Sequence, residues 1–468
     1  MKNKRLEEFK EKIKGKKIAV LGLGVSNIPA IEYLHKLGAY IYAHDLKDSL
    51  GKNCEQIKDL DNIEFFLDHK CFSGLNDVDY IVRSPGVKPF TKEIEEAVKK
   101  GVLLTSEMEL FMEFCPCKVI GITGSAGKTT VTTLVTEFLK AGGYNVWQGG
   151  NIGTPLFSKI EEIQKDDIVV LELSSFQLMT MKKSPNISLI TNIYEDHLDY
   201  HRSFEEYINA KTNIFTHQQK RDVCIFNFES AYTQKFLKMR EKLNIESEIL
   251  YFSGVNENIK GAYLKGKDIY LNETGNESKK VISVDEVKLK GNKNYINICS
   301  AICLVHDLVS LECITDTLKK FKGVEHRLEY VDTKNGVEYY NDSISTTPGK
   351  AMAALTSFDQ KIILIAGGYD KNLDYTNFGN YVIDSCKYVI LIGDTTKKIK
   401  DAILNNKRYE KENIKIKEAV SLEDAIKHAS SISKDGDIVV MSPASASFDM
   451  FKSYKQRGKI FKELVEKL

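Results

Sequence analysis

A glycine-rich loop followed by lysine and threonine is the strongest chemical pattern in the sequence. The string Gly121-Ile-Thr-Gly-Ser-Ala-Gly-Lys-Thr-Thr130 follows a β-branched run and leads into a helical pattern. Loop amides and a helix N-terminus hold phosphates, a lysine neutralises the β and γ positions, and a threonine hydroxyl binds Mg²⁺. The strict phosphate-loop pattern places glycine where this chain has Ile122, so the match is imperfect. The residues predicted to hold phosphate are Gly124, Ser125, Ala126, Gly127, Lys128, Thr129 and Thr130.

Two further polar positions follow predicted strands. Glu172 ends the run Ile168-Val-Val-Leu, and a carboxylate one strand away from a phosphate loop is the expected second Mg²⁺ ligand. His197 lies in the dense polar string Asn192-Ile-Tyr-Glu-Asp-His-Leu-Asp-Tyr-His201, which favours a role in a site. Lys211 on pattern alone is typical of a solvated lysine.

A second glycine pattern lies near the N-terminus. Gly22-Leu-Gly24 follows a strand and opens a helix, and Asp45 follows the next strand. A dinucleotide fingerprint has a third glycine where this chain has Asn27. Two ligands fit: NAD, as in an oxidoreductase, or a nucleotide-bearing substrate. The phosphate loop at 121–130 favours the second, because dehydrogenases do not need ATP.

The elements that must position these residues are short apolar runs separated by helical patterns. Such runs predict strands buried on both faces of mostly parallel sheets, and their alternation with helices predicts an α/β protein. Ligands in such sheets bind beyond the carboxyl ends of the strands, where the polar clusters fall. The runs begin at Lys17, Ala39, Tyr80, Val119, Ile168, Ile187, Ile362, Val389 and Ile438.

Length and composition limit the possible classes. A chain of 468 residues predicts about three domains, and 66 basic against 65 acidic residues give a net charge of +1. That balance argues against a nucleic-acid-binding protein or a polybasic membrane anchor. The charged N-terminus predicts no signal peptide, and no apolar run is long enough for a membrane span. Cys115-Pro-Cys117 has two interpretations, a metal or redox pair or two free thiols, and it lacks a second cysteine pair at ligand spacing. The nine cysteines are therefore expected to be free thiols in a reducing cytoplasm.

Taken together, these patterns resemble the Mur ligase family of bacterial cell-wall enzymes over essentially the whole chain. Within the family, they resemble most the members that add D-glutamate. The strings that carry this resemblance are Gly149-Gly-Asn151-Ile-Gly-Thr-Pro155, Glu172-Leu-Ser-Ser-Phe-Gln-Leu178, Glu195-Asp-His-Leu-Asp199 and Ser442-Pro-Ala-Ser-Ala-Ser447.

The resemblance implies three domains: a Rossmann-like domain at 1–106 that binds the UDP substrate, a central P-loop ATPase-type domain at 107–323 with a mostly parallel sheet, and a C-terminal Rossmann-like domain at 324–468 that binds the amino acid. It implies UDP-N-acetylmuramoyl-L-alanine, D-glutamate and ATP as substrates, and Mg²⁺, expected as two ions, as cofactor. We also expect a cytoplasmic monomer that binds neither nucleic acid nor membrane.

The resemblance also assigns individual roles. Lys128, His197 and a carbamylated Lys211 would be catalytic. The metal ligands would be Thr129, Glu172, His197 and Lys211. The residues expected at ATP beyond the phosphate loop are Asn294, Asn297, Arg327 and Asp342. The residues expected at the UDP substrate are Val25, Ser26, Asp45, Leu46, Lys47, Gly86 and Asn151. The residues expected at D-glutamate are Thr346, Lys371, Ser447, Phe448 and Tyr454.

Two positions depart from the family pattern. Ile344 stands where the family often has a lysine that helps to hold the D-glutamate end, and Lys293 stands where a histidine is common. Lys350 is the nearest lysine to Ile344 in sequence, with no geometric reason to choose it. Two alternatives therefore remain: another ATP-dependent ligase of the same fold, such as a sibling or folylpolyglutamate-type enzyme, and a nucleotide-binding module without catalysis.

Overall fold

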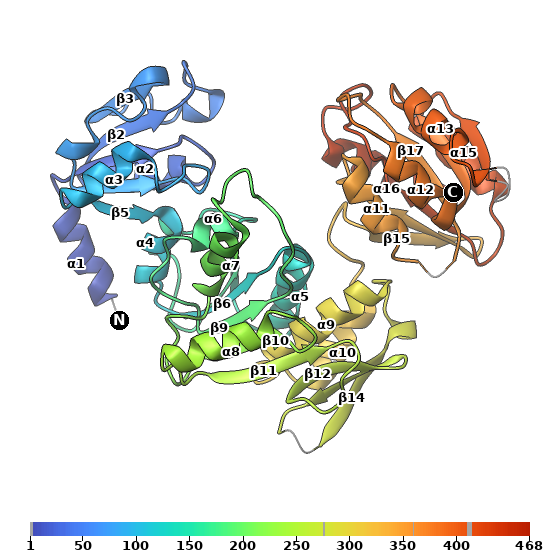
Figure 1. Ribbon diagram of the computed structural model, residues 1–468, viewed down its shortest axis with the longest axis horizontal. Coiled ribbons are helices and arrows are strands. Elements are labelled where there is room, and N and C mark those ends of the chain that lie inside the picture. The colour runs from blue at the N-terminus through green and yellow to red at the C-terminus, as the bar shows by residue number, and fades with distance from the viewer. Residues whose placement is uncertain (1–2, 275–276, 359, 410–413) are drawn as a thin grey trace. The chain divides into compact units, whose positions relative to one another are not determined.

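The computed structural model describes residues 3–274, 277–358, 360–409 and 414–468 (Figure 1). They form three sheets, and contact clustering divides the chain into two compact units. The first unit comprises Met1–Lys265, Tyr270–Lys280 and Asn297–Ile314; the second comprises Gly266–Ile269, Val281–Ile296 and Thr315–Leu468. The predicted α/β architecture is confirmed, with most strand pairs parallel.

The N-terminal sheet has the strand order β3-β2-β1-β4-β5. Isoleucines and valines of its central strands are buried on both faces, as the continuous apolar runs predict. Helix α2 covers one face, and helix α3 packs with Leu75 and Val78 on the other. The elements are α1 (Lys4–Ile13), β1 (Lys17–Leu21), α2 (Asn27–Lys36), β2 (Tyr40–Asp45), β3 (Ile63–Leu67), β4 (Tyr80–Arg83), α3 (Lys92–Lys99) and β5 (Leu103–Ser106).

The central sheet has the order β14-β13-β12-β11-β10-β9-β6-β8-β7. Its first elements are α4 (Glu107–Phe114), β6 (Lys118–Thr123), α5 (Lys128–Ala141), β7 (Val146–Gly150), β8 (Ile168–Glu172), α6 (Ser175–Leu178), β9 (Ile187–Ile190), α7 (Phe204–Thr212), β10 (Val223–Asn227) and α8 (Thr233–Lys242). The later ones are β11 (Glu248–Ser253), β12 (Gly261–Lys265), β13 (Asp268–Asn272), β14 (Ser278–Ser283), α9 (Asn292–Val305) and α10 (Leu311–Lys320).

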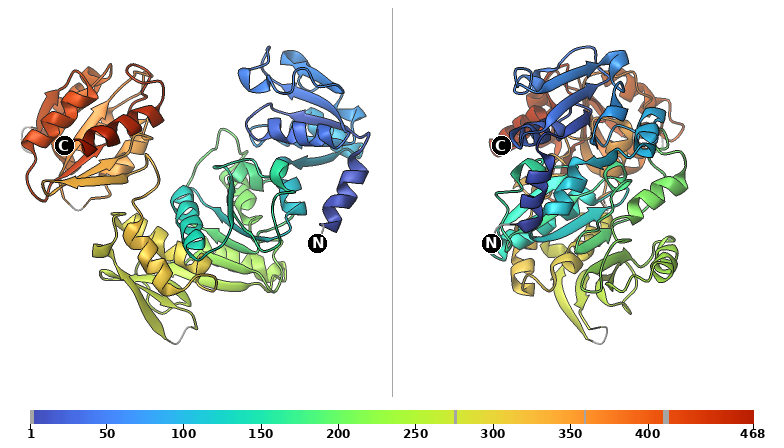
Figure 2. Two further views of the ribbon diagram at one scale, coloured as in Figure 1. Left: turned by 180° about the vertical axis from the view of Figure 1, so that it is seen from behind. Right: turned by 90° about the vertical axis from the view of Figure 1, so that its left-hand side faces the viewer.

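The C-terminal sheet has the order β15-β16-β20-β17-β18-β19 and carries helices on both faces (Figure 2). Helices α11, α12 and α13 share one apolar core with it, and α15 and α16 share the other. The elements are β15 (Glu329–Lys334), β16 (Val337–Asn341), α11 (Pro348–Leu355), β17 (Ile362–Gly367), α12 (Thr376–Ser385), β18 (Cys386–Ile392), α13 (Thr396–Leu404), β19 (Lys415–Glu418), α15 (Leu422–Ile432), β20 (Ile438–Met441) and α16 (Tyr454–Glu466).

All nine apolar runs form strands, in which the backbone groups pair in ladders and most of the side chains are buried. Among the described residues, no helix combines the length and apolar character that crossing a bilayer requires.

Arg83 joins the first sheet to the central one within the first unit. Its side chain is fully buried, and its guanidinium donates to the carbonyl oxygens of Phe176 (2.7 Å) and Val87 (3.0 Å) and to Oγ1 of Thr180 (3.2 Å). The guanidinium has five N–H donors in a fixed planar arrangement, which lets it serve several acceptors at once. The connection therefore depends on arginine chemistry as well as on apolar packing.

We expect Arg83→Ala to lower the free energy of unfolding of the first unit by about 3 kcal/mol, because buried acceptors would lose their donors. The measurement is urea unfolding followed by fluorescence of Trp147, the single tryptophan, which lies in β7 and donates to Asp167. Arg202→Ala is the control, since that arginine is exposed and its loss should change the free energy little. Equal unfolding midpoints for the two variants would contradict this account.

Candidate active site

Three neighbouring parallel strands bring the predicted phosphate loop, Glu172 and the 191–192 segment to one edge of the central sheet. Strand β6 lies between β8 and β9. In register, Ile122 faces Glu172 on one side, and Thr123 faces Ile190 on the other. All three strands run in the same direction, so their carboxyl ends meet. The sequence-predicted clusters at 124–130, 172 and 191–197 therefore begin from adjacent strand ends.

The loop between β6 and α5 requires glycine at two positions. Gly124 has φ +146°, and a Cβ there would collide with Oγ1 of Thr191 and approach the amide nitrogen of Asn192 to 3.1 Å. Gly127 has φ +85°, and its Cβ would lie 2.5 Å from Oδ1 of Asn297. Both the backbone conformation and the neighbours exclude larger residues. Asn297, which the resemblance implies at ATP, is thereby placed against the loop.

Side chains from the segment that follows β9 and from α7 hold this loop in position. The amide of Ala126 donates to Oδ1 of Asn192 (2.8 Å), and Thr191 Oγ1 donates to the carbonyl of Ala126 (2.6 Å). Ser125 Oγ lies 2.7 Å from the hydroxyl of Tyr207. The loop is thus fixed by specific polar contacts with the rest of the protein.

Lys128 opens helix α5 and bends back over the loop. Its Nζ donates to the carbonyl oxygens of Gly124 (2.8 Å) and Ser125 (3.1 Å). Thr129 and Thr130 follow in the first helical turn, where amides have no partner within the helix and the helix dipole favours anions. This arrangement is suited to binding a phosphate chain.

Glu172 is a buried carboxylate with one bonded and one unbonded oxygen. Its Oε1 accepts from Nδ2 of Asn151 (2.8 Å), while Oε2 is buried and has no hydrogen-bond partner among the described residues. An unsatisfied buried carboxylate oxygen is costly, and a cation would satisfy it. Within the described ranges, no three His, Cys, Asp or Glu side chains gather around a metal site. An ion here would bind Glu172 together with hydroxyl, phosphate or water oxygens, a donor set that Mg²⁺ accepts.

Lys211 lies on α7 and is buried. The expectation from pattern alone, a solvated lysine, is therefore wrong. Its Nζ donates to the carbonyl of Gly124 (2.9 Å) and to Oγ1 of Thr123 (3.3 Å). Burial lowers the pKa of Lys211 well below its ordinary value, and the charge of Lys128 lowers it further. The carboxylates of Asp196 and Glu172 oppose these effects. A neutral amine is thus favoured beside the phosphate loop.

His197 lies on the segment that follows β9, in a left-handed backbone conformation with φ +55°. Its imidazole is half-exposed, rests 4.8 Å from the ring of Phe176 and lies 3.4 Å from Asp196 Oδ2. The nearby His201 is buried and bonds Ser175 Oγ at 2.9 Å. Sequence reasoning selected His197 but gave no role to His201, although both stand in one polar string.

The loops that follow β1, β2 and β4 lie at one edge of the N-terminal sheet, since β1 lies between the other two strands. Asp45 links two of them: Oδ2 accepts from the amide of Leu23 (2.8 Å), and Oδ1 accepts from the amide of Lys47 (3.0 Å). Val25 and Leu46 are 78 % and 71 % exposed. The predicted UDP residues Val25, Ser26, Asp45, Leu46, Lys47 and Gly86 all belong to these loops.

The remaining predicted UDP-substrate residue, Asn151, lies elsewhere in the first unit. It follows β7, its amide nitrogen donates to the carbonyl of Glu172 (2.7 Å), and its side chain bonds the carboxylate of the same residue. It therefore belongs to the phosphate-loop edge of the central sheet. Gly150 permits this approach, because a Cβ there would strike the backbone of Glu172.

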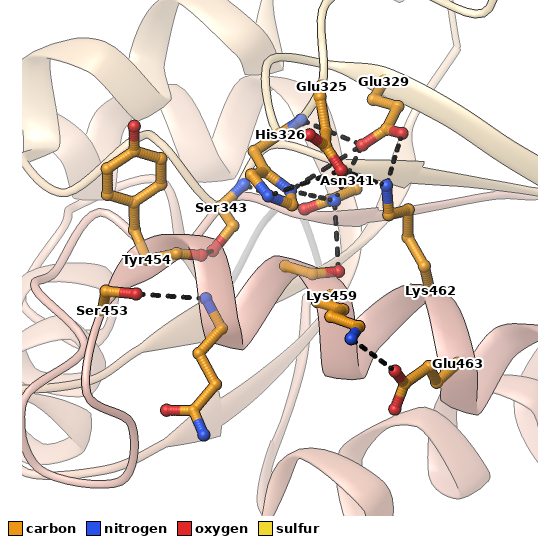
Figure 3. Close-up of polar contacts among 12 residues, drawn as sticks. Glu325, His326, Glu329, Asn341, Ser343, Ser453, Tyr454, Lys459, Lys462 and Glu463 are labelled. Carbon is orange, nitrogen blue, oxygen red and sulfur yellow. Dashed lines mark hydrogen bonds and ion pairs between the residues drawn. The ribbon is translucent and has the colours of Figure 1, made fainter.

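Arg327 lies in the second unit, on a segment that a polar cluster around His326 holds (Figure 3). His326 has φ +65°, and its Nδ1 accepts from Nδ2 of Asn341 (3.0 Å), which also donates to Glu329 (3.0 Å). Lys462 of α16 pairs with Glu329 at 3.0 Å. These contacts fix the backbone on both sides of Arg327. Asn294, also placed in the second unit, donates from Nδ2 to the carbonyl of Lys290 (2.7 Å).

Asp342 follows β16 and is buried. Its carboxylate accepts from Ser442 Oγ (2.7 Å) and from the amide of Leu328 (3.2 Å). Burial raises the pKa of Asp342 to about 6, although hydrogen bonds from Ser345 and Ser442 lower it. Strands β16 and β20 are neighbours, so this carboxylate joins two strand ends of the C-terminal sheet.

The predicted D-glutamate residues also follow strand ends of the second unit. Lys371 follows β17, and its Nζ lies 5.6 Å from the centroid of the exposed Phe448 ring. Ser447 precedes Phe448 and is buried, and Tyr454 opens α16, where its carbonyl accepts from Ser343 Oγ (2.8 Å). Thr346 lies on the loop after β16. Strands β16, β20 and β17 are consecutive in the sheet, so these loops share one edge.

Arg457 is a positioning residue that sequence reasoning missed. It is fully buried on α16, and its guanidinium donates to Oγ (3.0 Å) and the carbonyl (2.9 Å) of Ser343 and to the carbonyls of Ser445 (3.1 Å) and Ala446 (3.0 Å). It thus ties the loop after β16 to the loop after β20. Ile344, which stands where the family often has a lysine, is half-buried. Lys350, the nearest lysine in sequence, is exposed on α11.

Family models match three successive segments of the chain. They are described as the Mur ligase MurD-like N-terminal domain (residues 16–106), the Mur ligase middle domain (122–305) and the Mur ligase glutamate ligase domain (326–445). The UDP-N-acetylmuramoylalanine--D-glutamate ligase of Acetivibrio thermocellus is 43 % identical over 470 residues, covering 100 % of this chain and 99 % of that protein. The enzyme of the same name from Clostridium tetani is 43 % identical over 468 residues, with both chains fully covered.

Solved structures support the fold. The UDP-N-acetylmuramate-alanine ligase of Thermotoga maritima aligns with a TM-score of 0.55 at 18 % identity, covering 97 % of this chain and 99 % of that one. The MurF ligase of Thermotoga maritima, solved with ADP, aligns with a TM-score of 0.51 at 18 % identity, covering 98 % and 97 %. At these identities, the structures establish shared architecture alone.

We expect Gly124→Ala to weaken ATP binding at least tenfold, because the new Cβ collides with Thr191 and forces the loop out of shape. Titration calorimetry with a non-hydrolysable ATP analogue measures the effect. Gly349→Ala is the matched control, since its Cβ meets no atom within 4 Å. Unchanged affinity in Gly124→Ala would show that the loop geometry does not determine nucleotide binding.

Proposed function

The chain belongs to the Mur ligase family, and we propose that it is an ATP-dependent ligase that joins D-glutamate to UDP-N-acetylmuramoyl-L-alanine in peptidoglycan precursor synthesis. The reaction releases ADP and phosphate. The observation that carries this proposal is the meeting of a phosphate loop, an unsatisfied carboxylate and a buried lysine at one sheet edge, in a chain 43 % identical throughout to ligases of that name.

The chemistry explains why ATP is needed. A carboxylate is a poor electrophile because its charge is delocalised. Its oxygen attacks the γ-phosphorus of ATP, ADP leaves, and the resulting acyl phosphate has a good leaving group. The amine of D-glutamate then attacks the carbonyl carbon, and the tetrahedral intermediate collapses to an amide and phosphate. The difficult point is the approach of an anionic carboxylate to an anionic phosphate, which requires preorganised positive charge.

Lys128 and the first turn of α5 are suited to supply that charge. The Nζ of Lys128 already lies against the loop carbonyls, so binding of phosphate requires little rearrangement. Thr129 presents a hydroxyl in the same turn. Arg327 and Asp342 of the second unit and Asn294 and Asn297 would complete the ATP site, as the family resemblance implies. Exclusion of water by the assembled site would limit wasteful hydrolysis.

Mg²⁺ fits the central-sheet edge because Glu172 has a buried oxygen without a partner. Glu172, Thr129, His197 and Lys211 would hold it, and we propose two ions. Bound Mg²⁺ would neutralise phosphate charge and polarise the transferring group. Since Mg²⁺ prefers oxygen ligands, His197 would serve the substrate as much as the metal.

Lys211 can act as a metal ligand if its amine is carbamylated. Carbon dioxide reacts with a neutral amine, and the resulting carbamate is an anionic oxygen ligand. Burial favours the neutral amine of Lys211, which supports this modification. The proposal explains why a lysine occupies a position beside Lys128, where a second ammonium would be repelled.

The substrates would divide among three domains at 1–106, 107–323 and 324–468. The loop residues Val25, Ser26, Asp45, Leu46, Lys47 and Gly86 would hold UDP, and Asn151 would contact the muramoyl-alanine arm. The residues proposed for D-glutamate are Thr346, Lys371, Ser447, Phe448 and Tyr454. The enzyme is proposed to act as a cytoplasmic monomer, without nucleic acid or membrane.

Phosphate release in the presence of UDP-N-acetylmuramoyl-L-alanine and ATP tests the proposed specificity. We expect D-glutamate to support release at least 100-fold faster than L-alanine, L-glutamate or a diamino acid. Lys128→Ala should lower the rate at least 100-fold, because the phosphates then lose the positive charge closest to the loop. Release with another amino acid but not with D-glutamate would support a sibling activity instead. Unchanged release by Lys128→Ala would place the turnover at another site.

Removal of dissolved carbon dioxide and bicarbonate tests the modification of Lys211. We expect depletion to lower the turnover rate at least tenfold and added bicarbonate to restore it, because the carbamate is in equilibrium with free carbon dioxide. Lys211→Ala should be inactive, with partial rescue by short carboxylic acids. Full activity of Lys211→Ala, or activity independent of bicarbonate in the wild type, would refute this role.

A further inference from the structure

Two thiols lie next to each other at the opposite edge of the central sheet from the phosphate loop. Cys115 and Cys117 occupy the three-residue connection between α4 and β6, with Pro116 between them. Their Sγ atoms are 3.7 Å apart, and Cys115 Sγ is also 3.8 Å from the carbonyl oxygen of Cys117. The sequence predicts free thiols here, and the structure adds that the two sulfurs are in contact. The proposed ligase reaction uses neither.

This pair differs from the other cysteines in its exposure. Both thiols are half-buried and so can be reached by small reagents. Cys313 is the one further half-buried cysteine, and it has no cysteine beside it in sequence. The remaining cysteines are buried: Cys54, Cys71, Cys224, Cys299, Cys303 and Cys386. The pair lacks the further ligands that a metal site needs, because the described residues contain no group of three metal-ligating side chains.

Cys117 also lines an open cavity of about 630 Å³. Its wall is formed by the first residues of β6, β9, β10 and β11 and by the 303–308 segment around the end of α9. Because the phosphate loop lies at the carboxyl ends of these strands, the cavity lies at the other end of the sheet. A small molecule can therefore reach Cys117, beside Cys115, without entering the proposed ATP site.

The surroundings favour reactivity at Cys115. The hydrogen bond with Cys117 lowers the pKa of the Cys115 thiol against the opposing effect of burial, and the charge of Lys183 lowers it further. By contrast, burial raises the pKa of Cys224 and of Cys303 to about 12. Because the thiolate is the nucleophile, Cys115 is the better attacking group.

The geometry also permits a disulfide bond between Cys115 and Cys117. A disulfide requires the sulfurs to approach from 3.7 Å to about 2.05 Å, with Cα atoms about 4.4–6.8 Å apart. Residues two apart have Cα atoms separated by at most about 7 Å. Pro116 fixes its own φ, and Cys115 has the extended ψ of 124° that a residue before proline prefers.

We propose that Cys115 and Cys117 form a reversible dithiol–disulfide site that reacts with low-molecular-weight disulfides. The Cys115 thiolate attacks one sulfur of the small disulfide, whose S–S bond breaks and releases one thiolate. The Cys117 thiolate then attacks Cys115 Sγ, forms the intramolecular disulfide and releases the second thiolate. Two electrons pass from the protein to the small disulfide, which leaves as two thiols after taking up the two cysteine protons.

Glutathione disulfide added to the full-length chain, followed by acid quenching and peptide mass analysis, tests the proposal. Trypsin yields a peptide of residues 101–118 that contains both cysteines and no others. We expect this peptide to lose two hydrogens and to resist alkylation by iodoacetamide, and dithiothreitol should reverse both changes. The readout is mass, so it is independent of the proposed ligase activity.

Single variants separate the role of Cys115, which attacks the small disulfide, from that of Cys117, which closes the intramolecular disulfide. Cys117→Ser should retain glutathione on Cys115 as a stable mixed disulfide. Cys115→Ser should react at least about fivefold more slowly, because the remaining thiol lacks the lowered pKa. Cys313→Ser is the matched control and should behave as wild type. A peptide 101–118 that stays fully reduced, or that carries glutathione on both cysteines, would overturn the proposal. Ring closure at equal rates in folded and urea-unfolded chain would do so as well.

Discussion

Two lysine amines share one acceptor at the centre of the proposed active site. The Nζ atoms of Lys128 and Lys211 donate to the same carbonyl oxygen, that of Gly124, at 2.8 and 2.9 Å. Lys128 is half-buried and Lys211 is buried, so burial together with the repulsion between two neighbouring ammonium groups favours the neutral form of Lys211. The more buried Lys211 is the one whose pKa falls. The charge available for phosphate, the identity of the metal ligands and the shape of the loop all depend on this arrangement.

Much of the fold could be predicted from the sequence because the apolar runs are long and nearly continuous. All nine became strands, and the loop at 121–130 was recognisable from its glycines and its lysine. Burial of Lys211 could not be predicted from pattern, since a single lysine on a helix gives no local signal. Tyr207 and Arg457 were missed for the same reason. Their roles arise when elements far apart in sequence become neighbours, as when Tyr207 of α7 meets Ser125.

In the second unit, the sequence shows a departure at position 344, and the structure shows how the loops around that position are held. Ile344 stands where the family resemblance implies a lysine, and Lys350, the nearest lysine in sequence, is exposed on α11. What the sequence did not reveal is how firmly the surrounding loops are held. Arg457 binds carbonyls of both loops, and Asp342 bonds Ser442 across neighbouring strand ends. The arrangement of Thr346 and Ser447 therefore depends on backbone contacts that do not require a lysine at position 344.

Asn151 links the proposed substrate site to the proposed metal site. Its side chain bonds Oε1 of Glu172, and the same residue is the proposed contact of the muramoyl-alanine arm. If the substrate competes for that amide, the carboxylate loses its one protein donor and becomes a stronger ligand for a cation. Substrate and metal would then increase each other's affinity by the same factor, as linkage requires. A single asparagine would thereby couple the two sites, so that each ligand binds more tightly once the other is present.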